Sequence, residues 1–222
     1  MAKQVTDSNL AAAAALVAAA SIHARARKGG AVVVAIDGRS GAGKSTLAGA
    51  VAEIVGAAVV PSDDFFAAEV PSSEWDRLSP AERVQDAIDW RRLRREAIEP
   101  LLAGKPARWR AFDFSARRPD GSYRLAAELR ECAAASVILL DGAYSSRPEL
   151  ADLISLSVLV EAPAPVREAR LRAREEDAFL REWHERWDAA EAHYFEQVRH
   201  RSSFDLIFSA GAEARPQSRP IM

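Results

Sequence analysis

The sequence IDGRSGAGKST, residues 36–46, lies between the apolar run AVVV, residues 31–34, and the segment LAGAVAEIVG, residues 47–56. The apolar run is typical of a buried strand of a parallel sheet, and the later segment has the small-apolar spacing of a helix. Glycines between them allow backbone N–H groups to turn inward and form an anion site at a helix N-terminus. Strand, loop and helix occur in the required order, so a glycine-rich turn that matches by chance is the weaker explanation. We therefore predict a phosphate-binding loop formed by Gly38, Arg39, Ser40, Gly41, Ala42, Gly43, Lys44, Ser45 and Thr46.

Two side chains of this loop predict the ligand. In the pattern Gly-x-x-x-x-Gly-Lys-Ser, Lys44 is expected to reach the terminal phosphates of a nucleotide, and Ser45 to place its hydroxyl on Mg²⁺. The expected cofactors are therefore ATP and Mg²⁺.

Composition limits the remaining function classes. The chain has 222 residues, of which 49% are hydrophobic and 28% charged, as in an ordinary soluble globular protein. Its formal net charge of -2 argues against nucleic acid as a partner. The single cysteine, Cys132, fits a reducing cytoplasm. The alanine-rich run 10–20 is too short to span a bilayer, so no membrane partner is expected.

Apolar runs and helical patterns alternate along the chain. Strands are predicted at 31–36, 57–60, 136–140, 156–161 and 205–208, and helices at 44–55, 79–102 and 165–200. This alternation predicts an α/β fold with a five-stranded parallel sheet and helices on both faces, the three-layer P-loop NTPase architecture. We expect one domain over 31–210, preceded by a helix packed on it within 1–30 and followed by a flexible tail over 211–222.

One region, near 106–125, departs from the alternation. Two aromatic-rich runs flank the turn dipeptide Asp120-Gly121, which predicts an inserted β-hairpin. A hairpin here would overhang the carboxyl ends of the sheet, where open α/β sheets bind ligands. Trp109 and Phe112 are then candidates to line a substrate pocket. A surface hairpin without a role in binding is the alternative.

Carboxylates follow two of the predicted strands. Asp63 and Asp64 come after the second strand, where one of them could accept a hydroxyl proton and orient the attacking oxygen. The alternative is that the pair caps the following helix. Asp141 follows the run SVILL, residues 136–140, and is the expected second carboxylate of a Mg²⁺ site together with Ser45 and Asp63.

A basic helical face follows the fourth strand. Arg167, Arg170, Arg174 and Arg181 are three, four and seven residues apart and share one face of the predicted helix. They could neutralise charge on a transferred phosphoryl group, or form a solvated face paired with nearby acids. We predict a lid near 165–182.

These segments resemble the uridine kinase-like family of P-loop kinases, within the phosphoribulokinase/uridine kinase superfamily. The resemblance covers about 31–208 and is carried by IDGRSGAGKST (36–46), SDDFF (62–66), DWRRLRREAIEPLLAGKPARWRAFDF (89–114), VILLDGAYSSRPEL (137–150) and VREARLRAR (166–174). It implies transfer of the γ-phosphoryl group of ATP or GTP to a hydroxyl of a small molecule.

The resemblance also assigns roles to individual residues. Asp63 matches the family's base, Asp113 an acid that binds substrate hydroxyls, and Arg170 and Arg174 the lid arginines. Tyr144 is a further substrate-binding candidate. Lys44, Asp63, Arg170 and Arg174 are the expected catalytic residues.

Three departures from uridine kinases bear on the acceptor. Asp141-Gly142 replaces the usual Glu-Gly, the hairpin lacks the expected histidine, and the lid segment is short. The first keeps the carboxylate, whereas the other two put uridine as the acceptor in doubt. The sequence leaves the acceptor, the choice between Asp63 and Asp64, and a homodimer open.

Two other function classes compete with a kinase. A nucleotide-hydrolysing switch needs neither an acceptor pocket nor a base, and no guanine-reading Asn-Lys-x-Asp occurs in the chain. A kinase fold that has lost activity would not need Lys44, Ser45, Asp63 and Asp141 together. We therefore expect an enzyme with a small-molecule hydroxyl acceptor.

Overall fold

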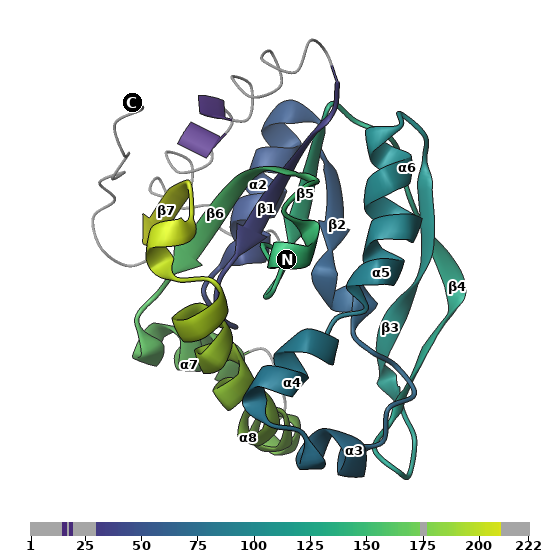
Figure 1. The fold of residues 1–222 in the computed structure, drawn as a ribbon, viewed down its shortest axis with the longest axis vertical. Helices are drawn as coiled ribbons and strands as arrows, with labels where there is room; N and C mark the ends of the chain where they lie inside the picture. The colour runs from purple at the N-terminus through teal and green to yellow at the C-terminus, as the bar shows by residue number, and fades with distance from the viewer. Residues whose placement is uncertain (1–14, 17, 20–29, 174–176, 210–222) are drawn as a thin grey trace.

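The computed structural model describes residues 15–16, 18–19, 30–173 and 177–209. Within 177–185 it describes the backbone and, of the side chains, that of His184. A five-stranded sheet forms the centre of the molecule (Figure 1). Its strands are β1 (Val32–Asp37), β2 (Ala58–Pro61), β5 (Val137–Asp141), β6 (Ile154–Glu161) and β7 (Leu206–Ser209). They lie in the order β2-β5-β1-β6-β7, and all four pairings are parallel.

Both faces of this sheet are covered, which explains why its central strands are apolar throughout. Val32, Val34 and Ile36 of β1 point to one face, where they pack with α2 (Lys44–Val55). Val33 points to the other face and joins the larger core cluster, which includes the helices after β2 and part of the C-terminal helix. The predicted α/β fold with helices on both faces is confirmed.

The helix predicted over 79–102 is wrong as a single element. This range instead forms α4 (Pro80–Asp86), α5 (Trp90–Leu93), a π-helical turn η2 (Arg94–Ile98) and α6 (Glu99–Leu102), and a further helix, α3 (Ser72–Arg77), precedes it. Between α4 and α5 the backbone pairs with the segment after β2, through a bridge between Ile88 and Phe66. Asp89 then caps α5 by accepting a hydrogen bond from the Arg92 N–H. These long-range pairings interrupt a segment whose local pattern favours one helix.

The predicted hairpin is present and longer than expected. β3 (Ala107–Arg117) and β4 (Tyr123–Cys132) pair antiparallel and form a separate two-stranded sheet. It flanks the main sheet on the side of β2 (Figure 1). Its tip contacts α3, because the Ser72 N–H donates to the carbonyl oxygen of Asp120.

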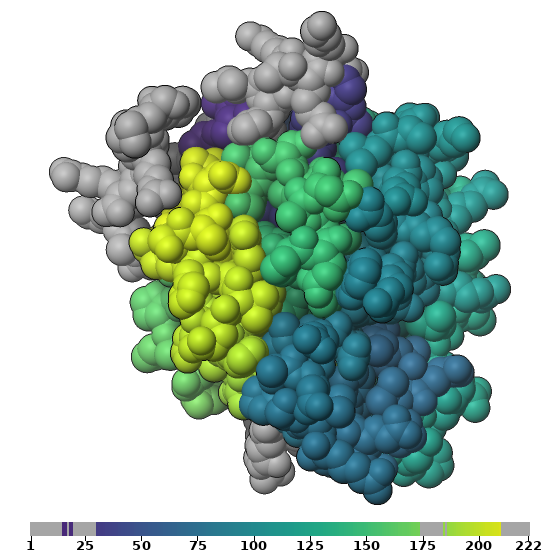
Figure 2. Space-filling view, viewed as in Figure 1, coloured from purple at the N-terminus to yellow at the C-terminus, as the bar shows by residue number. Residues whose placement is uncertain are grey.

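The long helix predicted over 165–200 is also interrupted. α7 (Ala164–Arg172) and α8 (Asp177–His193) are separate helices, and α8 continues into a π-helical turn η4 (Tyr194–Val198). α7 lies against the loop after β1, whereas α8 packs on α4, where Arg83 donates to the carbonyl oxygen of Arg186. The two helices thus have different packing partners. Figure 2 shows the C-terminal segment and the α3–α6 segment meeting on one face of the molecule.

Short 3₁₀ turns complete the described chain: η1 (Ser62–Phe65), η3 (Pro148–Leu150) and η5 (Arg201–Ser203). Of the N-terminal helix expected within 1–30, only residues 15–16 and 18–19 are described; they are helical, and Leu16 is buried in the cluster around α2. The expected tail over 211–222 lies outside the described residues. None of the helices described here has the length and apolarity needed to cross a bilayer.

Candidate active site

The loop after β1 has the backbone that its glycines predicted. Gly38, Gly41 and Gly43 have φ of 149°, 77° and 107°, values that side chains rarely adopt. A Cβ on Gly38 would lie 2.2 Å from the carbonyl oxygen of Val160, and one on Gly41 would lie 2.7 Å from that of Arg167. Gly38 and Gly41 are therefore needed both for the loop conformation and for its close packing on β6 and α7, and Gly43 for the conformation alone.

Asp37, the last residue of β1, holds the loop to its surroundings. Its carboxylate is fully buried and accepts hydrogen bonds from the N–H groups of Gly38 (2.8 Å), Tyr144 (3.1 Å) and Ser146 (2.9 Å) and from the Tyr194 hydroxyl (2.8 Å). Burial raises the pKa of Asp37, and these donors act against that rise. The sequence analysis missed this residue, although an acid at the end of a buried strand was the available signal.

Asp63 and Asp64 have different environments. Asp64 is buried, and its Oδ2 accepts hydrogen bonds from Trp109 Nε1 (2.7 Å) and from Arg130 (2.8 Å). Burial raises the pKa of Asp64, partly offset by Trp109 and Arg130. Asp63 is exposed. Of the pair, Asp63 is therefore the carboxylate accessible to a ligand, and Asp64 is held in the structure.

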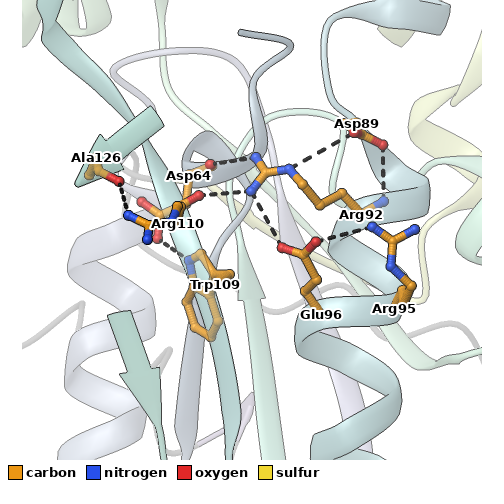
Figure 3. Close-up of polar contacts among 8 residues, drawn as sticks. All are labelled: Asp64, Asp89, Arg92, Arg95, Glu96, Trp109, Arg110 and Ala126. Atoms are coloured by element: carbon orange, nitrogen blue, oxygen red, sulfur yellow. Dashed lines mark hydrogen bonds and ion pairs between the residues drawn. The ribbon is translucent and has the colours of Figure 1, made fainter. Parts of the chain in front are cut away.

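Arg92 fixes the backbone at this point (Figure 3). Its guanidinium donates to the carbonyl oxygens of Asp64 (3.0 Å) and Arg110 (2.7 Å) and so joins η1 to the hairpin. The side chain stacks on Phe65, with the guanidinium carbon 4.6 Å from the ring centroid. Trp109 lies beside it, 1% exposed, with its ring 5.6 Å from that of Phe65. The structure therefore places Trp109 in the core.

The end of β5 brings Asp141 to the same edge of the sheet. Asp141 is buried, and a Cβ on the next residue, Gly142, would lie 1.8 Å from Ser62 Oγ and 3.2 Å from Asp63 Oδ1. The segments that end β2 and β5 are therefore in direct contact. This brings together two of the three predicted metal ligands, Asp63 and Asp141, at the carboxyl edge of the sheet.

Tyr144 has a strained backbone next to this edge. Its φ is 64°, in the left-handed region, and its ring is buried against Tyr194 with centroids 4.9 Å apart. Within the described residues its hydroxyl has no hydrogen-bond partner. Burial raises the pKa of Tyr144, and the charges of Glu191, Asp37 and Asp63 raise it further. The Tyr144 side chain therefore lies among the acids of the site.

Two of the predicted lid arginines contact the loop. Arg167 donates to the carbonyl oxygen of Ser40 (3.2 Å), and Arg170 donates to those of Gly41 (3.1 Å) and Ala42 (2.9 Å). The guanidinium groups of α7 thus lie at the loop, where they could also meet an anion. Arg174 and the side chain of Arg181 lie outside the described part of the chain.

Glu191 of α8 contacts the loop from another side. It is 6% exposed, and its two carboxylate oxygens accept hydrogen bonds from the Ser40 N–H at 3.1 and 3.2 Å. Oε1 also accepts from the Ser40 hydroxyl at 2.5 Å. Lys44 Nζ donates to the carbonyl oxygen of Arg39 at 3.1 Å. A carboxylate thus accepts a hydrogen bond from a loop N–H group, and such groups bind phosphate oxygens in this type of loop.

A cleft of about 690 Å³ lies beside η1, between the segment after β2, α4–α5 and the hairpin. Its walls are partly apolar and carry several charged groups: Phe66, Glu69, Asp86, Ile88, Asp89, Trp90, Arg91, Arg92, Arg118, Arg124 and Leu125.

The hairpin residues predicted to bind substrate lie outside these walls. Phe112 is buried between Phe114 and Tyr123, with ring centroids 4.7 and 4.8 Å away. Asp113 accepts hydrogen bonds from the N–H (2.9 Å) and the hydroxyl (2.6 Å) of Ser115, which lower its pKa. Contact of Trp109, Phe112 and Asp113 with an acceptor therefore stays a prediction.

This arrangement fits a nucleotide with its metal ion. The loop presents N–H groups and Lys44, the arginines of α7 lie beside it, and Ser45, the second residue of α2, is exposed. A carboxylate already acts as an anion on one loop N–H. Within the described residues, no three histidine, cysteine or acidic side chains gather into a ready-made metal site.

Comparison with solved structures identifies the fold. A D-glycerate 3-kinase from Cryptococcus neoformans var. grubii superposes with a TM-score of 0.62 over 95% of this chain and 99% of its own, at 15% identity. A possible uridine kinase from Bacillus stearothermophilus gives a TM-score of 0.60 over 81% of this chain and 89% of its own, at 18% identity. The chain has a P-loop kinase fold. No family model and no curated protein sequence matches it.

The P-loop kinase fold agrees with the resemblance drawn from the sequence motifs. At these identities the likeness extends to the architecture and not to the substrate. The function therefore has to be argued from the site itself.

Proposed function

We propose that this chain is an ATP-dependent kinase that transfers the γ-phosphoryl group to a hydroxyl of a small metabolite, nucleoside or sugar-like. The observation that carries the proposal is the position of Asp63. It is an exposed carboxylate at the carboxyl edge of the sheet, beside Gly142, while its neighbour Asp64 is held by Trp109 and Arg130. A kinase needs such a carboxylate next to its phosphate loop, whereas a nucleotide switch does not.

Each loop and lid residue then has a role. Lys44, Arg170 and Arg174 would neutralise charge on the transferred group, and the loop N–H groups would hold the phosphates. Ser45, Asp63 and Asp141 would hold Mg²⁺, directly or through water. Asp63 would take the proton of the acceptor hydroxyl as its oxygen bonds to the γ-phosphorus and the bond to the β-phosphate oxygen breaks.

The acceptor would enter beside η1. The cleft between α4–α5 and the hairpin is adjacent to Asp63 in sequence and offers both apolar surface and charged groups. The acceptor-site residues predicted from the sequence are Tyr144, Phe112, Trp109 and Asp113. To bind an acceptor hydroxyl, Asp113 would have to give up its hydrogen bond from Ser115. Both solved neighbours carry the name of a kinase with a hydroxylated acceptor, which supports this reaction class. A small cytoplasmic metabolite is the proposed partner.

The fate of the γ-phosphate tests the proposal. The protein is incubated with γ-labelled ATP, Mg²⁺ and a mixture of nucleosides, sugars and sugar acids, and the label is traced. A kinase transfers it to an organic product, and this transfer is lost in Lys44→Ala. Label found only in free inorganic phosphate would support the nucleotide-hydrolysing switch instead.

A further inference from the structure

The contact between Glu191 and Ser40 joins two segments that are 151 residues apart. Glu191 is buried, and within the described part of the chain its hydrogen bonds go to one loop residue, with both oxygens on the N–H and one on the hydroxyl. Buried carboxylates are costly unless hydrogen-bonded, so these donors are what hold Glu191 in place. The loop donors and the carboxylate therefore stabilise each other.

Ser40 belongs to the outer end of the loop. It lies four residues before Lys44, whereas the inner phosphates are held by N–H groups near the helix N-terminus. Lys44 is the side chain that reaches terminal phosphates in this motif. Its ammonium group donates to the carbonyl oxygen of Arg39, the residue before Ser40. Glu191 thus places a negative charge at the terminal-phosphate end of the loop.

The surroundings add to this charge. The charges of both Glu191 and Asp63 raise the pKa of the buried Tyr144 hydroxyl. Two nearby cations are already engaged: the Arg39 guanidinium is 3.7 Å from Glu196 and lies over the ring of Phe195, and Arg167 donates to the carbonyl oxygen of Ser40. An additional negative group at this end would be repelled by Glu191 unless the carboxylate moves away.

We infer that Glu191 is a specificity-determining residue that ATP displaces from Ser40 and that ADP leaves in place. The inference rests on the proposed function only in taking the loop as a nucleotide site. ADP fills the inner part of the loop and does not need the Ser40 donors. ATP adds a charged phosphate at the outer end and has to break the contact with Glu191.

The consequence extends along α8. Trp187, one turn before Glu191, packs on Trp75 and Phe66, with ring centroids 5.0 and 6.0 Å away. Phe66 also lines the cleft beside η1. Release of Glu191 by ATP therefore loosens a helix that packs against a wall of the proposed acceptor cleft.

Nucleotide binding tests the inference without measuring catalysis. Dissociation constants are measured by titration calorimetry for Mg²⁺ with ADP and with the non-hydrolysable β,γ-imido analogue of ATP. Glu191→Gln removes the charge and keeps an acceptor for Ser40. Glu196→Gln is the matched control, because it removes a charge from the same C-terminal helical segment, close to Arg39, without touching a loop N–H.

We expect Glu191→Gln to shift the ratio of the two constants by about tenfold in favour of the triphosphate, and Glu196→Gln to leave it within about twofold. An unchanged ratio, or equal weakening of both nucleotides, would overturn the inference and leave the kinase proposal standing. No binding of the triphosphate to the wild-type protein would overturn both.

Amide hydrogen exchange in the wild-type protein provides a second readout that needs no variant. The triphosphate analogue should increase exchange in residues 187–198, and ADP should not. Equal exchange with the two nucleotides would overturn the inference even if Glu191→Gln fails to fold.

Discussion

Trp109 Nε1 donates a 2.7 Å hydrogen bond to Asp64 Oδ2, and this bond separates the roles of two adjacent acids. Trp109 is in the core, so the acid that binds it is turned inward, and Asp63 remains at the surface. Arg130 donates to the same oxygen of Asp64 at 2.8 Å. A hairpin strand thus fixes the orientation of the segment that carries the proposed base.

The first prediction compares the two acids. Asp63→Asn should reduce turnover by about a hundredfold or more, because the amide cannot take the acceptor proton. Its melting temperature should stay close to that of the wild-type protein, since Asp63 is exposed. Asp64→Ala should instead lower stability by about 1–3 kcal/mol, because Trp109 Nε1 is left buried without an acceptor. Turnover and thermal melting are measured on both variants and on Asp64→Asn. A large turnover loss in Asp64→Asn with almost none in Asp63→Asn would reverse the assignment.

A second prediction concerns Lys44. Lys44→Ala should abolish phosphoryl transfer and leave the fold intact, because the side chain is partly exposed and its ammonium group donates to the carbonyl oxygen of Arg39 within the loop itself. Turnover and melting are measured together. Wild-type turnover in a folded variant would contradict the assignment of the phosphate loop.

The third prediction tests Asp113 as a reader of the acceptor. Asp113→Ala should raise the KM for the acceptor severalfold or more and leave the KM for ATP unchanged, since the loss of a hydrogen-bonded carboxylate costs about 1–3 kcal/mol. Ser115→Ala is the control, because it removes the internal partner and keeps the carboxylate. If both variants behave alike, or if neither changes the KM, Asp113 serves the hairpin turn and not the acceptor.

A fourth prediction concerns acid stability. Arg147 is 3% exposed and binds both oxygens of Glu149 at 2.9 Å, which lowers the pKa of Glu149 from 4.5. A lowered pKa in the folded state stabilises the protein above pH 4.5, and this contribution is lost as the pH falls further. Glu149→Gln should therefore lower the free energy of unfolding by about 1 kcal/mol at pH 7. We expect this low value because the Glu149 side chain is 35% exposed. The difference from the wild-type protein should shrink toward pH 3. Denaturant unfolding measures it, and a difference independent of pH would contradict the ion pair.

The features that the sequence predicted correctly are those with a local signature. The loop has its glycines in a fixed pattern, and each strand of the parallel sheet is a short apolar run, because both faces are buried. Asp120-Gly121 likewise predicted the hairpin, because the conformation of a turn depends on the residues within it.

The features that were missed depend on partners far along the chain. Glu191 meets Ser40 across 151 positions, and Tyr194 meets Asp37 across 157. The break at 87–89 likewise arises from pairing of Ile88 with Phe66, against a local helical pattern. No spacing within α8 distinguishes Glu191 from an acid on a solvated face, so the sequence alone could not place it at the loop.

The central claim is that Asp63, at the carboxyl edge of the sheet, activates an alcohol. Its most direct test is ADP formation from ATP and Mg²⁺, with and without individual nucleosides, sugars and sugar acids, in the wild-type protein and in Asp63→Asn. We predict that at least one compound raises ADP formation and is recovered in phosphorylated form, and that Asp63→Asn loses this stimulation. ADP formation that no hydroxylated compound stimulates, with no phosphorylated product, would contradict the claim.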